Sequence, residues 1–253
     1  MSDVPASSES ITSPQNPRVK FWVELRKNGQ ARRDAGLYQL EGLRAVESLA
    51  AQTSGAPAQQ IDTLIVSWKE LERQSPEALA RAQAVAAQVT AAGGHLVEVT
   101  RDVFHKIADV ETPQGIMAIA KIPQVAVAEL VATLAENKSL AIAGVNVNDP
   151  GNLGTLLRSA AAFGADALFA LEGSVDPFHP KVLRASAGNR LPVARGPWAE
   201  FREACRTHKV RVIGVALPLP GQPAAPLDKL KVKKSEAIVL CVGGEANGFP
   251  ENA

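Results

Sequence analysis

Short apolar segments alternate with helix-like segments along the chain, and this alternation begins twice. In the first part of the chain, four segments rich in apolar and β-branched residues are predicted to be strands: "LYQLEG", "IDTLIVS", "HLVEVT" and "GIMAIAK". Helices are expected around them, over residues 16–33, 43–51, 76–92 and 103–108. Strands that alternate with helices in this way indicate a small α/β domain.

The alternation begins again after a connection that carries one helix. Five near-continuous apolar segments are predicted to be strands: "LAIAGVNV", "ALFALEG", "LPVARG", "KVRVIGVALP" and "AIVLCVGG". Helices are expected between them, over residues 153–163, 180–187 and 199–208. Such strands are typical of a parallel sheet that is buried on both faces. The predicted organisation is a disordered tail (1–10), an α/β domain (11–122), a linker with a helix (123–137) and a second α/β domain (138–253).

The composition indicates a packed globular protein and restricts its environment. Of the 253 residues, 46% are hydrophobic and 21% are charged. No apolar run is long enough to cross a membrane, and the start "MSDVPASSES" lacks the pattern of a secretory signal. Cys205 and Cys241 are too few for a disulfide framework and lack the spacing of a metal site. We therefore expect a cytoplasmic protein that binds neither a membrane nor a metal.

The net charge of +1 conceals three groups of basic residues. The first group lies in the first predicted helix and comprises Arg18, Lys20, Arg26, Lys27, Arg32 and Arg33. The second comprises Lys181, Arg184, Arg190 and Arg195, and the third is the segment "KLKVKK" at residues 229–234. A solvated surface explains any one group, but three of them in a near-neutral protein indicate binding surfaces for an anion such as a nucleic acid.

Three polar loops directly follow predicted strands of the second domain: "NDPGNLG", "EGSVDPFHP" and "GGEANGFP". In an open parallel sheet, ligands bind outside the carboxyl ends of the strands. The G-x-G fingerprint of a dinucleotide-binding loop occurs nowhere in the chain, so a conventional nucleotide-binding enzyme is disfavoured. The loops therefore predict a different kind of ligand site at that edge of the sheet.

These loops and the helices after them carry a resemblance to a known family. The segments "DPGNLGTLLRSAAAFGAD", "VDPFHPKVLRASAGN" and "IVLCVGGEANGFP" resemble the first, second and third motifs of the SpoU (TrmH-type) RNA ribose 2′-O-methyltransferases, members of the SPOUT superfamily. The start of the chain and "VETPQGIMAIAK" resemble the family's substrate-binding domain, which is similar to the ribosomal protein L30e fold. The resemblance covers about residues 10–252.

The resemblance implies a methyl transfer from S-adenosylmethionine to a ribose 2′-hydroxyl, with ribosomal RNA as the first expected substrate and transfer RNA as the second. It also implies a homodimer and a catalytic domain with a trefoil knot. The motifs assign catalytic roles to Asn152, Arg158 and Glu245. They assign cofactor binding to Leu171, Gly243, Gly244, Glu245 and Gly248. The expected RNA-binding residues are Arg18, Lys20, Arg32, Arg33, Lys181 and Arg184. Lys181, Arg184, Ser186 and Gly188 match the second motif, which in the family helps to form the cofactor pocket and the dimer contact.

Arg158 is the residue whose chemical role most needs an explanation. A ribose hydroxyl is a weak acid, so the site must stabilise negative charge that develops on its oxygen. A guanidinium stays protonated at ordinary pH; we therefore expect Arg158 to stabilise the oxyanion and an adjacent phosphate by paired hydrogen bonds, and not to act as a base. Asn152, at the start of its helix, is expected to cap the helix and to orient the ribose oxygen and the adjacent phosphate. The alternative role for Arg158 is a surface salt bridge.

The third motif departs from the family pattern at its end. In the family it continues into a Ser-Leu-Asn segment and a final helix, which the sequence to Ala253 does not contain. We expect the knot, the cofactor pocket and tight cofactor binding to require that segment. The alternative to an active enzyme is therefore a catalytically impaired RNA-binding protein derived from the same fold.

Overall fold

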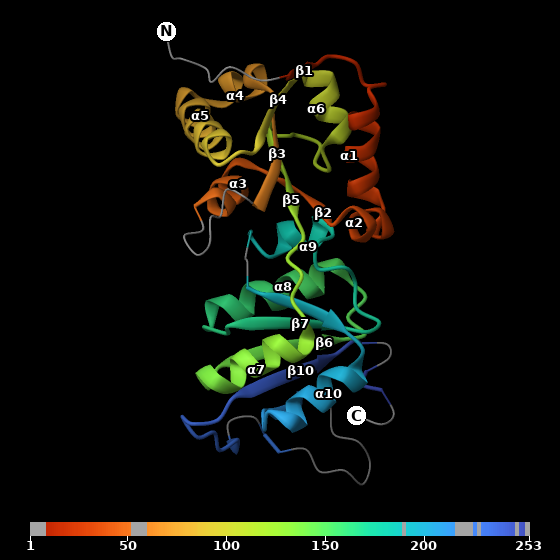
Figure 1. Ribbon diagram of the computed structural model, residues 1–253, viewed down its shortest axis with the longest axis vertical. Helices are drawn as coiled ribbons and strands as arrows, with labels where there is room; N and C mark the ends of the chain where they lie inside the picture. Colours follow the sequence, from red (N-terminus) through yellow and green to blue (C-terminus); the bar gives the residue numbers. More distant parts are fainter. Residues whose placement is uncertain are drawn as a thin grey trace. The chain divides into compact units, whose positions relative to one another are not determined.

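The computed structural model describes residues 9–51, 60–188, 191–215, 225–226, 229–245 and 248–250, and it divides into two compact units (Figure 1). The first unit runs to Ile122 and includes Phe178–Pro180. The second unit holds the rest of the chain from Pro123. Residues 1–8 of the predicted tail lie outside the described residues.

The first unit is built on a mixed sheet of five strands. Their order is β1 (Glu9–Ile11), β4 (His95–Val99), β3 (Ile61–Val66), β5 (Ile116–Lys121) and β2 (Leu37–Glu41). Strands β1, β4 and β3 pair in parallel, whereas β5 is antiparallel to both of its neighbours. The helices are α1 (Pro17–Lys27), α2 (Gly29–Ala35), α3 (Leu43–Ala50), α4 (Trp68–Gln74), α5 (Pro76–Ala91) and α6 (Arg101–Ile107). Apolar side chains of α1 and α6, such as Trp22 and Phe104, pack with strand residues in one core cluster.

Three details of the first unit differ from the sequence-based expectation. The single helix expected over 16–33 is two helices, because Asn28 has an extended backbone and its side chain accepts the N–H groups of Gln30 and Ala31 at the start of α2. Residues 9 and 10, expected in the tail, belong to β1, where Glu9 pairs with Val97. Helix α4 was not predicted from the sequence at all.

The second unit contains the predicted parallel sheet. Its order is β8 (Val193–Gly196), β7 (Ala167–Leu171), β6 (Leu140–Val145), β10 (Ile238–Gly243) and β9 (Arg211–Val215), and every pairing is parallel. From β6 the chain adds β7 and β8 on one side, and then β9 and β10 on the other. The strand order therefore reverses between β6 and β10, which is where open parallel sheets bind ligands.

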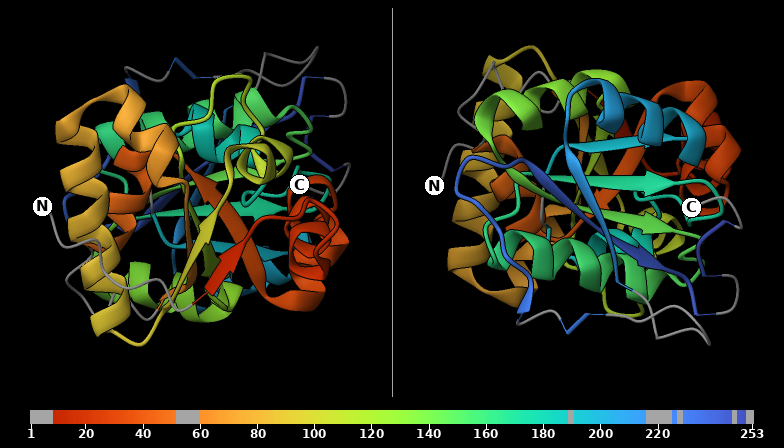
Figure 2. Two further views of the ribbon diagram at one scale, coloured as in Figure 1. Left: turned by 90° about the horizontal axis from the view of Figure 1, so that it is seen from above. Right: turned by 90° about the horizontal axis from the view of Figure 1, so that it is seen from below.

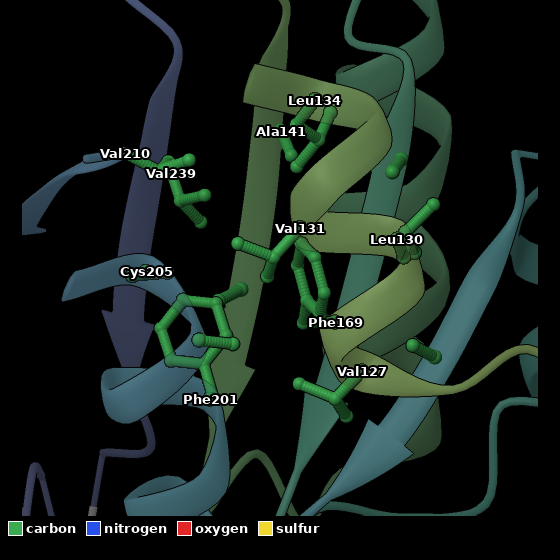
Figure 3. Close-up of a cluster of buried hydrophobic side chains, with 14 of the residues drawn as sticks. Val127, Leu130, Val131, Leu134, Ala141, Phe169, Phe201, Cys205, Val210 and Val239 are labelled. Atoms are coloured by element: carbon green, nitrogen blue, oxygen red, sulfur yellow. The ribbon is translucent and has the colours of Figure 1, made fainter. Parts of the chain in front are cut away.

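Helices cover both faces of this sheet. Helices α7 (Val127–Asn137) and α10 (Trp198–Thr207) lie on one face, and α8 (Pro150–Ala162) lies on the other with α9 (Pro180–Ala185) packed against it (Figure 2, right). Figure 3 shows side chains of α7 and α10, among them Val131 and Phe201, around Phe169 of the sheet. Cys205 and Cys241 are buried in the same cluster, and burial raises the pKa of each thiol to about 12. Both thiols therefore stay protonated and unreactive.

Residues 123–137 were expected to form a linker with a helix. In the structure, helix α7 belongs to the second unit. Val127, Leu130, Val131 and Leu134 recur at helical spacing and are all buried in the core cluster of the second unit. An amphipathic helix beside a sheet gains stability by covering it, so these residues extend the second unit towards its amino terminus.

Candidate active site

A cavity of about 420 Å³ lies at the carboxyl ends of β6 and β10, the point where the strand order reverses. Its wall is formed by the loop after β6, the start of α8 and the end of β10: Asn146, Val147, Asn148, Asp149, Asn152, Thr155, Leu156, Val242, Gly243, Gly244 and Glu245. The volume falls within the range of about 300–1,000 Å³ that is typical of small-molecule sites. Two of the three predicted ligand-binding loops therefore meet at one cavity.

The start of α8 places Asn152 in the cavity wall. Asp149 is the N-cap of the helix, since its carboxylate accepts the N–H group of Asn152 at 2.8 Å, and Pro150 occupies the first turn. Asp149, not Asn152 as expected, therefore caps this helix. The side-chain amide of Asn152 is free for another partner and donates to Oε1 of Glu245 at 3.4 Å. Two of the three predicted catalytic residues thus lie in direct contact.

Asn146 joins the ends of three strands and was not identified from the sequence. Its φ of 55° is left-handed, a conformation that asparagine tolerates better than most residues. Its backbone N–H donates to the carbonyl of Glu172 at 3.1 Å, after β7. Its side-chain amide donates to the carbonyl of Gly248 at 3.1 Å, after β10. An asparagine directly after the apolar strand "LAIAGV" was the only sequence signal for this role.

Ser174 fixes the loop after β6 in the same way and was also missed. Its hydroxyl donates to the carbonyl of Gly144 at 3.1 Å and accepts the N–H group of Val147 at 3.1 Å. The N–H group of Val175 donates to the carbonyl of Val147 at 2.9 Å. The second predicted loop therefore does not line the cavity but holds the first loop in place.

The glycines at the end of β10 allow a close approach of backbones. A Cβ atom on Gly244 would lie 1.9 Å from the carbonyl oxygen of Asn146, and one on Gly243 would lie 2.9 Å from the carbonyl carbon of Gly248. The N–H group of Gly248 donates to the carbonyl of Gly244 at 2.8 Å, and its own φ is 54°. Gly243 and Gly244 line the cavity, whereas Gly248 supports them from outside it.

Two other predicted site residues lie outside the cavity wall. The side chain of Leu171 is 2% exposed and packs in the core, so it does not line this cavity. Arg158 is exposed on α8, beyond the residues that line the cavity. Among the described residues, no carboxylate lies within ion-pair distance of its guanidinium. The surface salt bridge that was its alternative role is therefore absent from the part of the chain that the structure describes.

The second motif forms a helix contact and does not line the cavity. Gly154 of α8 packs so closely on α9 that a Cβ atom would lie 2.5 Å from Cβ of Ala185. Ser186 is buried and its hydroxyl donates to the carbonyl of Leu183 at 2.9 Å, while Gly188 has a φ of 72°. Lys181 and Arg184 are exposed on α9. The contribution expected from this motif to the cofactor pocket is not seen in the cavity wall.

Of the basic residues predicted to bind RNA in the first unit, Lys20 and Arg33 are exposed, and Arg18 forms an ion pair with Glu9 and lies over the ring of Trp22. Arg32 is different, because it is only 1% exposed. Its Nη1 atom donates to the carbonyls of Leu25 at 2.7 Å and Arg26 at 3.1 Å, at the end of α1. The prediction that Arg32 contacts RNA is wrong; it satisfies carbonyl groups that the end of a helix leaves without partners.

Replacing Arg32 with methionine is expected to destabilise the protein by about 1–3 kcal/mol, because buried carbonyl groups lose their donor. Urea unfolding followed by circular dichroism measures the change. The matched control is Arg33→Met on the same helix, where the exposed side chain donates to Gln30. A change below about 0.5 kcal/mol is expected there. Equal losses in the two variants would contradict a structural role particular to Arg32.

The fold and the cavity define an α/β protein with a small-molecule site at the switch point of a parallel sheet, attached to a separate α/β unit. Residues 139–253 match the SpoU rRNA Methylase family, and residues 16–118 match the MRM3-like substrate binding domain. The chain is 30% identical, over 95% of its length and 84% of the relative's, to a 23S rRNA (guanosine(2553)-2'-O)-methyltransferase from Bacillus subtilis. It is 33% identical, over 71% of its length and 40% of the relative's, to the mitochondrial rRNA methyltransferase 3 of Xenopus tropicalis.

A solved structure supports the same relationship. An AdoMet-bound rRNA methyltransferase from Sinorhizobium meliloti matches with a TM-score of 0.79 and 26% identity, covering 96% of this chain and 84% of that chain. The chain therefore belongs to the SpoU family of rRNA methylases, as the motifs predicted. It is an rRNA methyltransferase, and the Sinorhizobium meliloti relative is AdoMet-bound.

None of the helices in the described residues combines the length and the apolar character needed to span a membrane. The described residues also contain no group of three or more His, Cys, Asp or Glu side chains placed to hold a metal ion.

Proposed function

We propose that the second unit transfers a methyl group to the 2′-hydroxyl of a ribose in ribosomal RNA. We propose that the transfer takes place in the cavity at the carboxyl ends of β6 and β10. The observation that carries the proposal is the contact between Asn152 and Glu245 beside the glycine backbone of β10. The name of the Bacillus subtilis relative, a 2'-O-methyltransferase, supports the choice of the ribose oxygen.

The cavity fits S-adenosylmethionine on two counts. Its volume suits a small-molecule cofactor, and Gly243 and Gly244 present bare backbone where a side chain would collide with Asn146 or Gly248. We assign cofactor binding to these two glycines, with Glu245 beside them and Gly248 in support. When bound, the cofactor supplies an electrophilic methyl group on a sulfonium.

The residues of the chain then have to accept the proton of the ribose hydroxyl and stabilise the negative charge that develops on its oxygen. Of the two carboxylates that line the cavity, Asp149 caps α8, and Glu245 is left to accept the proton, directly or through water. Asn152 is held by Glu245 and positions the hydroxyl group. We assign Arg158 to the RNA side of the site, where its protonated guanidinium stabilises the oxyanion and an adjacent phosphate.

We further propose that the RNA is held by the first unit through Arg18, Lys20 and Arg33, and by Lys181 and Arg184 of α9. Exposed basic side chains suit phosphate contacts, which supply affinity without base specificity. The predicted homodimer also remains a proposal. It is supported by Phe163, the C-cap residue of α8, which has 84% of its surface exposed. The cytoplasm is the proposed location, supported by the bacterial relative.

Methyl transfer is tested with labelled S-adenosylmethionine and unmethylated ribosomal RNA, with transfer RNA as a second substrate. We expect label in ribosomal RNA, and we expect the modified linkage to resist alkaline hydrolysis, because the methyl group blocks the 2′-oxygen that would attack the phosphate. Label on a base, which leaves the linkage alkali-sensitive, would overturn the ribose assignment. Tight RNA binding with no transfer would favour the catalytically impaired RNA-binding protein.

A further inference from the structure

The basic segment "KLKVKK" plays no part in the cavity or in the proposed RNA contacts. All four of its lysines are exposed: Lys229, Lys231, Lys233 and Lys234. The segment is fixed to the second unit, because Nη1 of Arg211 donates to the carbonyl of Lys231 at 2.9 Å and the N–H group of Lys233 reaches Glu236 at 3.4 Å. The lysines thus project from an anchored loop.

The strand register puts this loop at the amino-terminal edge of the sheet, opposite the cavity. Ile238, the first residue of β10, pairs with Leu140 of β6 and with Arg211 of β9. The residues that precede these three strands therefore lie along one edge, and they include the exposed Lys138 and Lys209. We call these six residues the basic edge: Lys138, Lys209, Lys229, Lys231, Lys233 and Lys234.

Helix ends explain only part of this charge. Lys138 and Lys209 follow the carboxyl ends of α7 and α10, where a cation is favoured by the helix dipole. The four loop lysines have no such reason to be there. Of the nearby acids, Glu236 pairs with Arg211 and Glu203 pairs with Arg206. Within the described part of the chain, no carboxylate lies within ion-pair distance of the loop lysines.

We propose that the basic edge is a second contact surface for the RNA backbone, used by RNA that extends beyond the target nucleotide. The proposal rests on the proposed function, which makes RNA the polyanion that this protein meets. Exposed ammonium groups bind phosphate as point charges and release counterions, which needs no preformed pocket. The strands β6 and β10 have six residues each, so the edge lies about 17 Å from the cavity, a distance that one nucleotide does not span.

The test compares two variants. In the first, all four loop lysines are replaced by glutamine, and in the second, all four are replaced by arginine; these lysines are Lys229, Lys231, Lys233 and Lys234. Affinity is measured without cofactor, at several salt concentrations, for a long transcript of 23S ribosomal RNA and for a short hairpin. We expect the glutamine variant to bind the long transcript about tenfold or more weakly, with a salt dependence shallower by about 0.7–0.9 for each lost phosphate contact. The hairpin is expected to bind as it does to the unaltered protein, and the arginine variant is expected to retain both affinities.

Three results would overturn the proposal. Unchanged affinity and salt dependence in the glutamine variant would show that the basic edge does not bind RNA and that its partner is another polyanion, such as an acidic protein. Equal weakening for both RNAs would place the contact at the target site, and equal weakening in the arginine variant would show a loss of structure. Binding is measured without cofactor, so this test does not depend on methyl transfer. The absence of methyl transfer would contradict the proposed function but would not decide whether the basic edge binds RNA.

Discussion

In the protein extended by the family's Ser-Leu-Asn segment, replacing Arg158 with alanine is expected to lower the rate constant for methyl transfer by about 100- to 1,000-fold, the usual effect of removing one donor that stabilises an oxyanion. Cofactor affinity is expected to stay nearly unchanged, because Arg158 lies outside the residues that line the cavity. Single-turnover kinetics with labelled cofactor, together with calorimetry of cofactor binding, separates the two effects.

Two controls make the Arg158 result specific. Arg158→Lys is not expected to restore the rate, because a point ammonium does not reproduce the planar pair of hydrogen bonds. Ser159→Ala, which alters the next exposed residue of α8, is expected to leave the rate intact. Near-normal turnover in Arg158→Ala would remove the arginine from the catalytic site and leave the chemistry to Asn152 and Glu245.

In the same extended form of the protein, Gly244→Ala is expected to abolish measurable cofactor binding. Its Cβ atom would lie 1.9 Å from the carbonyl oxygen of Asn146, so the end of β10 and the loop after β6 have to move apart. That movement also breaks the hydrogen bond from the N–H group of Gly244 to Val145, which is 2.8 Å long. A loss of stability of about 1–3 kcal/mol is expected as well. Calorimetry measures binding, and urea unfolding measures stability.

The matched control for Gly244 is Gly214→Ala in β9, where the nearest atom to the added Cβ would be 3.6 Å away on the ring of Phe249. That variant is expected to bind the cofactor normally and to unfold at nearly the same urea concentration. Normal binding by Gly244→Ala would mean that the two strand ends are less tightly coupled than their contacts indicate.

The sequence predicted the features of the second unit that follow from regular patterns. Near-continuous apolar strands predicted the parallel sheet, and the motifs brought Asn152 and Glu245 to the same site. Asn146 and Ser174 escaped prediction, because their roles depend on hydrogen bonds between loops that follow different strands. Arg32 was misassigned for a related reason: a basic residue in a basic helix gives no sequence signal that it is buried against the end of another helix.

The position of β10 has a consequence for how the protein folds as it is synthesised. Strand β6 emerges early in the second unit, but β10, which completes its pairing, is the last along the chain of the sheet's described strands. Until Ile238–Gly243 leave the ribosome, β6 keeps an unpaired edge of the kind that favours wrong pairing or aggregation. Pairings between distant segments form slowly, so the cavity at the ends of β6 and β10 is expected to form late. A chain that has not yet released β10 already carries Asn146 and Asn152 but lacks the cavity.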